Sequence, residues 1–233
     1  MQGTEFPLLV ETLQQLHTDA IDWFNSPGHP TVDIYVRAIT ATSNLPQNAL
    51  SGPITIPIVE PEPPPPTAPP PDNPFDTRPQ VAYEQQLRDH EAALRDWRQK
   101  RDLQLVQLTQ QLDAMVGARV APSTTTDVFG CTDAAAMTFA SAPAESAKRL
   151  VYASDMQQTA PEQTINRRLD LVRVSVVNFT CEEVVSGDPG TPGAPAAQEC
   201  GQREQEVTRR HADLGATVEP FVAPSTRYRV LEP

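Results

Sequence analysis

The chain has 233 residues, enough for one large domain, and its 39% hydrophobic but only 6% aromatic content predicts a modest aliphatic core. Its formal net charge of −12 disfavours binding to phosphate backbones and anionic membrane surfaces, and no basic stripe offsets that charge, so we expect no nucleic-acid partner. No run of about 18 apolar residues is present, so no membrane span is predicted.

The N-terminal part of the chain is predicted to form a helix followed by a hairpin. Apolar residues recur at three- and four-residue steps over residues 8–25, which indicates an amphipathic helix. Residues 32–42 are rich in β-branched side chains and predict a strand, and the alternating residues 54–58 predict a second one. Pro57 cannot donate to a strand ladder, so the second strand is expected at an edge.

The 25 prolines are clustered rather than spread through the chain. Residues 59–79 therefore form a proline-rich insertion, and the dense tract at 61–74 predicts extended polyproline II or disordered chain. Two interpretations are open for it: a docking site for SH3- or WW-type modules, or a spacer between the edge strand and the next helix. We favour the spacer.

Residues 80–116 show the longest helical pattern. Four apolar residues at 3-4-3 spacing define its buried face in the second half: Leu105, Leu108, Leu112 and Met115. The first half, through Trp97, carries fewer apolar residues. We expect that first half to project from the domain and the second half to pack on a sheet; a coiled-coil partner is an alternative.

Downstream, loops, helices and strands alternate. In order, they are a hydroxyl-rich loop at 123–126, a helix at 130–141, a strand at 149–154, a strand at 171–179, a Gly/Pro/Ala loop at 184–198, a helix at 199–214 and a strand at 217–222. With the hairpin in front, this order predicts an α/β fold with one mostly parallel sheet and an antiparallel edge strand.

Two loops in this region carry candidate metal ligands. The strand at 149–154 ends in Asp155, and ligand sites of open α/β sheets lie beyond the carboxyl ends of strands. Thr126, with Thr125 beside it, adds hydroxyl oxygens, and a hard cation such as Mg²⁺ takes oxygen ligands. The alternative is that Thr126 caps the next helix and Asp155 caps a turn.

Together, these segments resemble the metal-site loops of von Willebrand factor A (VWA) domains. Thr126-Asp-Val-Phe-Gly130, followed by a small-residue helix, looks like the second loop of that site, and Ser154-Asp155-Met156 looks like the third. The resemblance implies a three-layer, Rossmann-like fold over residues 1–233. It also implies a non-enzymatic binding module whose divalent cation contacts a protein ligand. A degenerate structural module without metal is the runner-up.

One part of the family pattern is absent: no D-x-S-x-S occurs in the chain. In the family, this motif follows a central strand of the sheet. We therefore expect the gap to be closed by residues upstream of Met1, by a partner chain, including a second copy, or by a rearranged strand pairing, and we favour the upstream segment. The start of the chain also decides localisation, which is expected to be cytoplasmic if Met1 is the native start and extracytoplasmic if it is not.

Catalytic motifs are missing: there is no G-x-S-x-G, H-E-x-x-H, P-loop or G-x-G-x-x-G. A hydrolase is thus only a distant alternative. Among the cysteines, Cys181 and Cys200 bracket one loop and are a candidate disulfide, with two free thiols as the alternative. Cys131, near a predicted helix N-terminus, is expected to be a buried small side chain rather than a reactive thiolate.

Overall fold

The structure is a computed structural model that describes residues 5–68, 78–119, 123, 125–154, 156–161, 165–177, 179, 194–222 and 231. Its elements are, in order, α1 (Glu5–Asn25), β1 (Val32–Ile34), the short 3₁₀ helix η1 (Pro46–Asn48), β2 (Ile54–Ile56), α2 (Arg78–Val116), α3 (Val128–Ser141), β3 (Lys148–Ala153), β4 (Val172–Val177), α4 (Ala194–Asp213) and β5 (Thr217–Val218). The chain is thus mixed α/β, as the sequence predicts. None of these helices is long and apolar enough to cross a membrane.

The described strands form two sheets instead of the single sheet that we expected. β1 and β2 pair antiparallel, and β3, β4 and β5 form a parallel sheet in that order. The predicted strand at 32–42 is shorter than expected, because regular pairing ends at Ile34 and continues only as an isolated bridge between Arg37 and Ala49. Among the described strands, none is hydrogen-bonded to both sheets.

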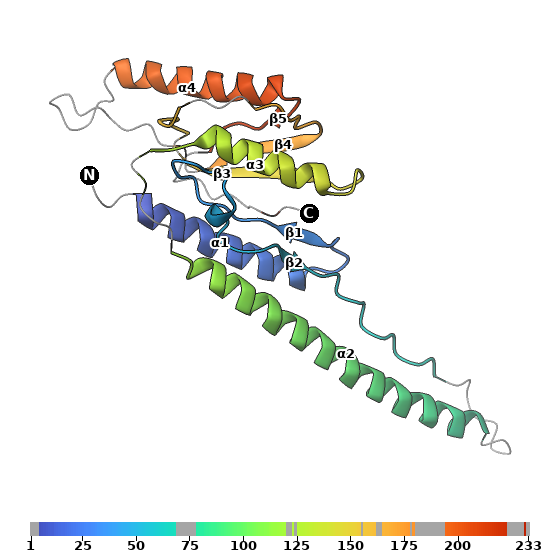
Figure 1. Ribbon diagram of the computed structural model, residues 1–233. Coiled ribbons are helices and arrows are strands. Elements are labelled where there is room, and N and C mark those ends of the chain that lie inside the picture. The colour runs from blue at the N-terminus through green and yellow to red at the C-terminus, as the bar shows by residue number, and fades with distance from the viewer. Residues whose placement is uncertain are drawn as a thin grey trace.

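The first core is built by α1, the β1–β2 hairpin and the C-terminal end of α2. The predicted apolar stripe of α1 is confirmed at Leu13, Leu16, Ala20 and Phe24, which are all buried. Ile54 and Ile56 of β2 pack against this stripe, together with the predicted face of α2: Leu108, Leu112 and Met115. In Figure 1 these elements occupy the lower part of the molecule.

The second core lies between the parallel sheet and the helices α3 and α4. Side chains alternate along a strand, so Tyr152, Val174 and Val176 share one face, and all three are buried. That face packs against Val128 of α3 and Val207 of α4. Figure 1 shows these elements together above the first core. The helix predicted at 199–214 begins earlier, at Ala194, so the end of the predicted loop 184–198 is helical.

A chain of buried polar groups crosses the second core. The Nδ1 of His211 lies 2.8 Å from the carbonyl oxygen of Val207, so Nδ1 carries the proton and Nε2 accepts one. The Tyr152 hydroxyl donates to that Nε2 at 3.1 Å and lies 2.5 Å from the Thr132 hydroxyl. Burial lowers the pKa of His211, which keeps its ring neutral, and raises the pKa of Tyr152. The network therefore ties α3, β3 and α4 together without charge.

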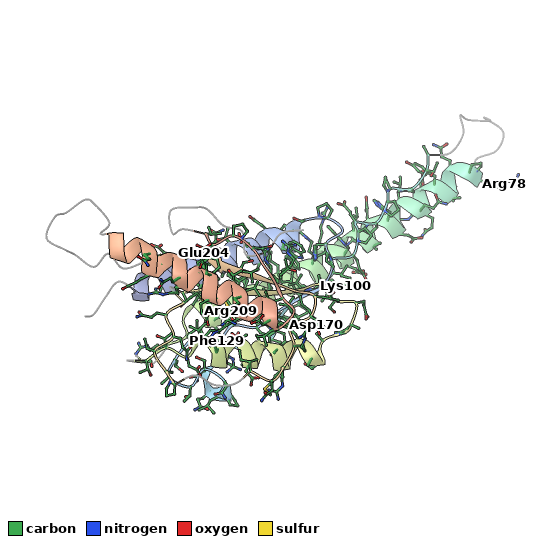
Figure 2. The ribbon with its side chains drawn as sticks, turned by 90° about the horizontal axis from the view of Figure 1, so that it is seen from above. Arg78, Lys100, Phe129, Asp170, Glu204 and Arg209 are labelled. Atoms are coloured by element: carbon green, nitrogen blue, oxygen red, sulfur yellow. The ribbon has the colours of Figure 1, made fainter. Side chains whose placement is uncertain are left out.

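The long helix α2 leaves the body as expected. Its second half carries the buried residues, and its first half extends away from the two cores (Figure 1). Figure 2 shows Arg78 at the far tip of this extension and Lys100 closer to the body. A coiled-coil partner for this half stays a prediction.

We predict that Tyr152→Phe destabilises the protein by about 1–3 kcal/mol, because it leaves the buried Nε2 of His211 without its donor. Urea unfolding measures this change. Tyr35→Phe is the matched control, since Tyr35 is 57% exposed, and it should leave stability unchanged. If Tyr152→Phe and Tyr35→Phe change the free energy of unfolding equally, the buried hydroxyl of Tyr152 contributes nothing to stability.

Candidate functional site

Asp127 caps α3 and is fully buried. Its Oδ1 accepts the backbone N–H of Gly130 at 2.9 Å, the usual role of an Asp at a helix N-terminus. Gly130 is required for this approach, because a Cβ at that position would lie 1.9 Å from Oδ2 of Asp127. The local sequence Thr-Asp-Val-Phe-Gly is thus explained by capping. The alternative that Thr126 caps the helix is wrong, because Asp127 holds that role.

The loop after β3 supplies a second cap to the same helix. Oε1 of Gln158 accepts the N–H groups of Val128 at 2.7 Å and of Phe129 at 3.3 Å. Its Nε2 donates to the carbonyl of Ala160 at 3.0 Å and lies 3.4 Å from Oδ1 of Asp127. The first N–H groups of α3 are therefore all occupied by side chains, so this helix N-terminus does not offer an open anion site.

Thr126 joins the two loops that carry the predicted ligands. Its N–H donates to the hydroxyl of Thr159 at 2.7 Å. Its carbonyl accepts the N–H groups of Thr159 at 3.0 Å and of Ala160 at 3.1 Å. The loop before α3 and the loop after β3 are thus fastened to each other backbone to backbone at the carboxyl end of β3.

A third segment, after β1, reaches the same place. The N–H of Asp127 donates to the carbonyl of Thr40 at 2.8 Å. Oδ2 of Asp127 accepts the N–H of Ser43 at 3.3 Å. Ser43 is itself held by Thr40, whose carbonyl accepts its hydroxyl. Three loops distant in sequence therefore meet around one buried carboxylate.

The predicted ligands are placed as follows. Thr126 and Thr125 are both partly exposed in the loop before α3. Asp155 lies outside the described residues, between Ser154 and Met156; the Ser154 hydroxyl accepts the Met156 N–H at 3.0 Å. Within the described ranges, no cluster of three or more His, Cys, Asp or Glu side chains could hold a metal ion. A cation here would rely on Asp155 and on hydroxyl oxygens.

Sequence reasoning missed Gln158, Thr159 and Ser43, although all three hold the site together. The sequence points to the segment after β3 only through Asp155, since nothing in a single sequence marks which amide will cap a helix thirty residues earlier. Asp127 belongs to the predicted motif, but the pattern does not predict its burial.

A polar cluster lies on the other face of the parallel sheet. Glu219, directly after β5, contacts Arg149 at 3.1 Å and also accepts hydrogen bonds from Arg173 and Ser175. Partial burial raises the pKa of Glu219, but the hydrogen bond from Ser175 and the guanidinium groups of Arg173 and Arg149 outweigh it. They lower the pKa to about 2. This cluster ties the three strands together and keeps Glu219 ionised.

The structure establishes the state of two of the three cysteines. Cys131 is buried in α3, and burial raises the pKa of its thiol to about 12, which confirms a packing role instead of a reactive thiolate. Cys200, in α4, is disulfide-bonded. Its predicted partner Cys181 lies outside the described residues, so the pairing stays a prediction.

Comparisons with known proteins give no assignment. No protein-family model matches the chain, and neither the curated proteins nor the solved structures yielded a match.

We predict opposite effects for two Gly→Ala substitutions. Gly130→Ala should destabilise the protein by about 0.5–2 kcal/mol, because the new Cβ displaces the capping carboxylate of Asp127. Gly201→Ala in α4 meets no atom within 4 Å and should stabilise by about 0.5–1 kcal/mol through helix propensity. Thermal unfolding compares them; a stabilising Gly130→Ala would contradict the cap.

We predict an acid-dependent contribution from Glu219. Because its pKa is lower in the folded state than in the unfolded chain, the stability it adds is complete above about pH 4.5 and disappears as the pH falls towards 2. Glu219→Gln should therefore cost about 1–2 kcal/mol at pH 7, after allowance for solvent screening, and nothing near pH 2.

The control for Glu219 is Asp170→Asn. The ion pair between Asp170 and Arg168 is exposed, at 61% and 64%, so its loss should change stability by less than about 0.5 kcal/mol. Asp170 is labelled in Figure 2. If Glu219→Gln lowers the free energy of unfolding by the same amount at every pH, the predicted link between the ionisation of Glu219 and stability is refuted.

Proposed function

We propose that this chain is a non-enzymatic binding or scaffolding module of VWA type, whose loops at the carboxyl end of β3 contact a protein ligand. The observation that carries the proposal is the junction of Thr126 with Thr159 and Ala160. It brings together the two segments that resemble the second and third loops of the VWA metal site. Ligands of open α/β folds bind at this edge of the sheet.

The proposal includes a divalent cation held by Thr126, Asp155 and Thr125. Because Asp127 and Gln158 already cap α3, the hydroxyl of Thr126 is not engaged in capping. The backbone of Thr126 is fixed on both sides, which would present its hydroxyl in one position. Oxygen ligands of this kind, completed by water, suit Mg²⁺.

The VWA interpretation also requires a strand beside β3. Within the described chain, β3 is hydrogen-bonded to β4 alone, and β1 to β2 alone. A strand from an upstream segment or from a second copy of the chain would pair with these two edges and merge the sheets. An upstream strand would carry the D-x-S-x-S loop to the same edge as Thr126, whereas a strand from a second copy, which lacks that motif, would complete the sheet alone.

We predict that the protein binds Mn²⁺ or Mg²⁺ and that Asp155→Ala abolishes the binding. Thr159→Val removes the hydroxyl that positions Thr126 and should weaken the affinity roughly 10–100-fold, as is typical for residues supporting a metal ligand. Isothermal titration calorimetry measures both effects.

Asp33→Ala provides the control for the metal titration. Asp33 is an exposed acidic residue of β1 whose partner is Thr55, so its loss should leave the binding heat unchanged. No binding heat from the wild-type chain would favour the degenerate structural module. Metal-dependent turnover of a generic ester or phosphate would instead revive the hydrolase.

A further inference from the structure

The described part of the proline-rich insertion, residues 59–68, runs antiparallel along the projecting half of α2 (Figure 1). Two aromatic side chains of the helix reach its backbone. Nε1 of Trp97 donates to the carbonyl of Glu60 at 2.8 Å, and Nε2 of His90 lies 3.1 Å from the carbonyl oxygen of Pro63. The favoured spacer interpretation is thus incomplete, since Glu60 and Pro63 of the proline-rich insertion make specific contacts with α2.

The spacing of these contacts matches the periods of two different helices. Trp97 and His90 are seven residues apart, and seven residues of α-helix rise about 10.5 Å. Their acceptors are three residues apart, and one three-residue turn of polyproline II rises about 9.3 Å. One turn of polyproline II, the conformation that the sequence predicts for this tract, would therefore span about the same length as the step along α2 from Trp97 to His90.

Burial along the tract follows the same three-residue period. Pro63 and Pro66 are half-buried, whereas Pro61, Pro64 and Pro65 are exposed. One edge of the extended segment hence faces α2. On the helix, Tyr83 is half-buried one further heptad before His90, so Tyr83, His90 and Trp97 lie on one stripe of α2.

Trp97 is held in place from the body side. The guanidinium carbon of Arg101 lies 5.8 Å from the Trp97 ring centroid, within cation–π range. The same guanidinium donates to Oδ1 of Asn25, at the end of α1, at 2.6 Å. The indole that contacts the tract is therefore positioned before the tract is bound.

We propose that the stripe Tyr83, His90 and Trp97 is a polyproline-binding surface, and that its ligand in the folded chain is the chain's own segment 59–68. The contacts are of a kind that suits polyproline recognition: a ring N–H donates to a carbonyl that has no partner within a polyproline II helix. The facing edge of the tract is thereby withheld from SH3- or WW-type modules. This inference is independent of the metal site.

Binding in trans tests the proposal. Residues 59–68 are replaced in the full chain by a Gly/Ser segment of equal length, and a synthetic peptide of residues 57–68 is titrated by calorimetry. We expect saturable binding to this variant and none to the intact chain, whose stripe is occupied. Trp97→Phe, which keeps a ring but loses the donor, should weaken the affinity about 2- to 10-fold. Equal binding to both chains, or no binding to the variant, would overturn the proposal.

Matched peptides test the facing edge. A peptide with Pro63→Gly and Pro66→Gly should bind more weakly than one with Pro61→Gly and Pro64→Gly, although both lose two prolines and the same stiffness. Equal affinities would mean that the tract has no preferred edge.

A measurement on the intact chain covers the case in which the Gly/Ser variant does not fold. The two indole N–H groups, of Trp97 and Trp23, give separate NMR signals, and Trp23 donates to the carbonyl of Pro30 at 3.3 Å as an internal reference. Pro63→Gly with Pro66→Gly should speed hydrogen exchange at Trp97 only, and Pro61→Gly with Pro64→Gly should not. Unchanged exchange at Trp97 would contradict the proposal.

Discussion

The buried carboxylate of Asp127 is the constraint on which the arrangement of this protein depends. A charge without solvent contact is costly unless it is hydrogen-bonded, and its partners come from three separate segments. It accepts N–H groups from Ser43 and Gly130 and is approached by the amide of Gln158. The same residue thus starts α3, fixes the segment after β1 and meets the loop after β3.

This junction matters because the described chain has two cores and two sheets. One core belongs to α1, the hairpin and α2, and the other to α3, α4 and the parallel sheet. No described strand is hydrogen-bonded to both sheets. The two halves of the chain are therefore connected largely through the loops around Asp127 and through the packing of Ile39 against the second core. The candidate site lies at this connection.

The sequence predicted the local elements well because their signals are local. The periodic Leu13, Leu16, Ala20 and Phe24 define α1, and the β-branched run at 172–177 defines β4. The division into two sheets depends on pairing between distant segments, which periodicity does not encode. The role of Gln158 and the docking of Pro63 on His90 are likewise contacts across many residues. Thr126 lies where the loop before α3 meets the loop after β3, but its role as a ligand stays a prediction, and the sequence does not indicate the residues that hold it.

Native-state hydrogen exchange of Asp127→Ala tests the central claim most directly. In the wild-type chain, the amides of β2 in the first core and of β4 in the second should open with one shared free energy. In Asp127→Ala, we predict that the two values separate, because the halves lose the carboxylate that holds their loops together. If both values fall equally and stay matched, other contacts couple the halves and Asp127 is only a helix cap.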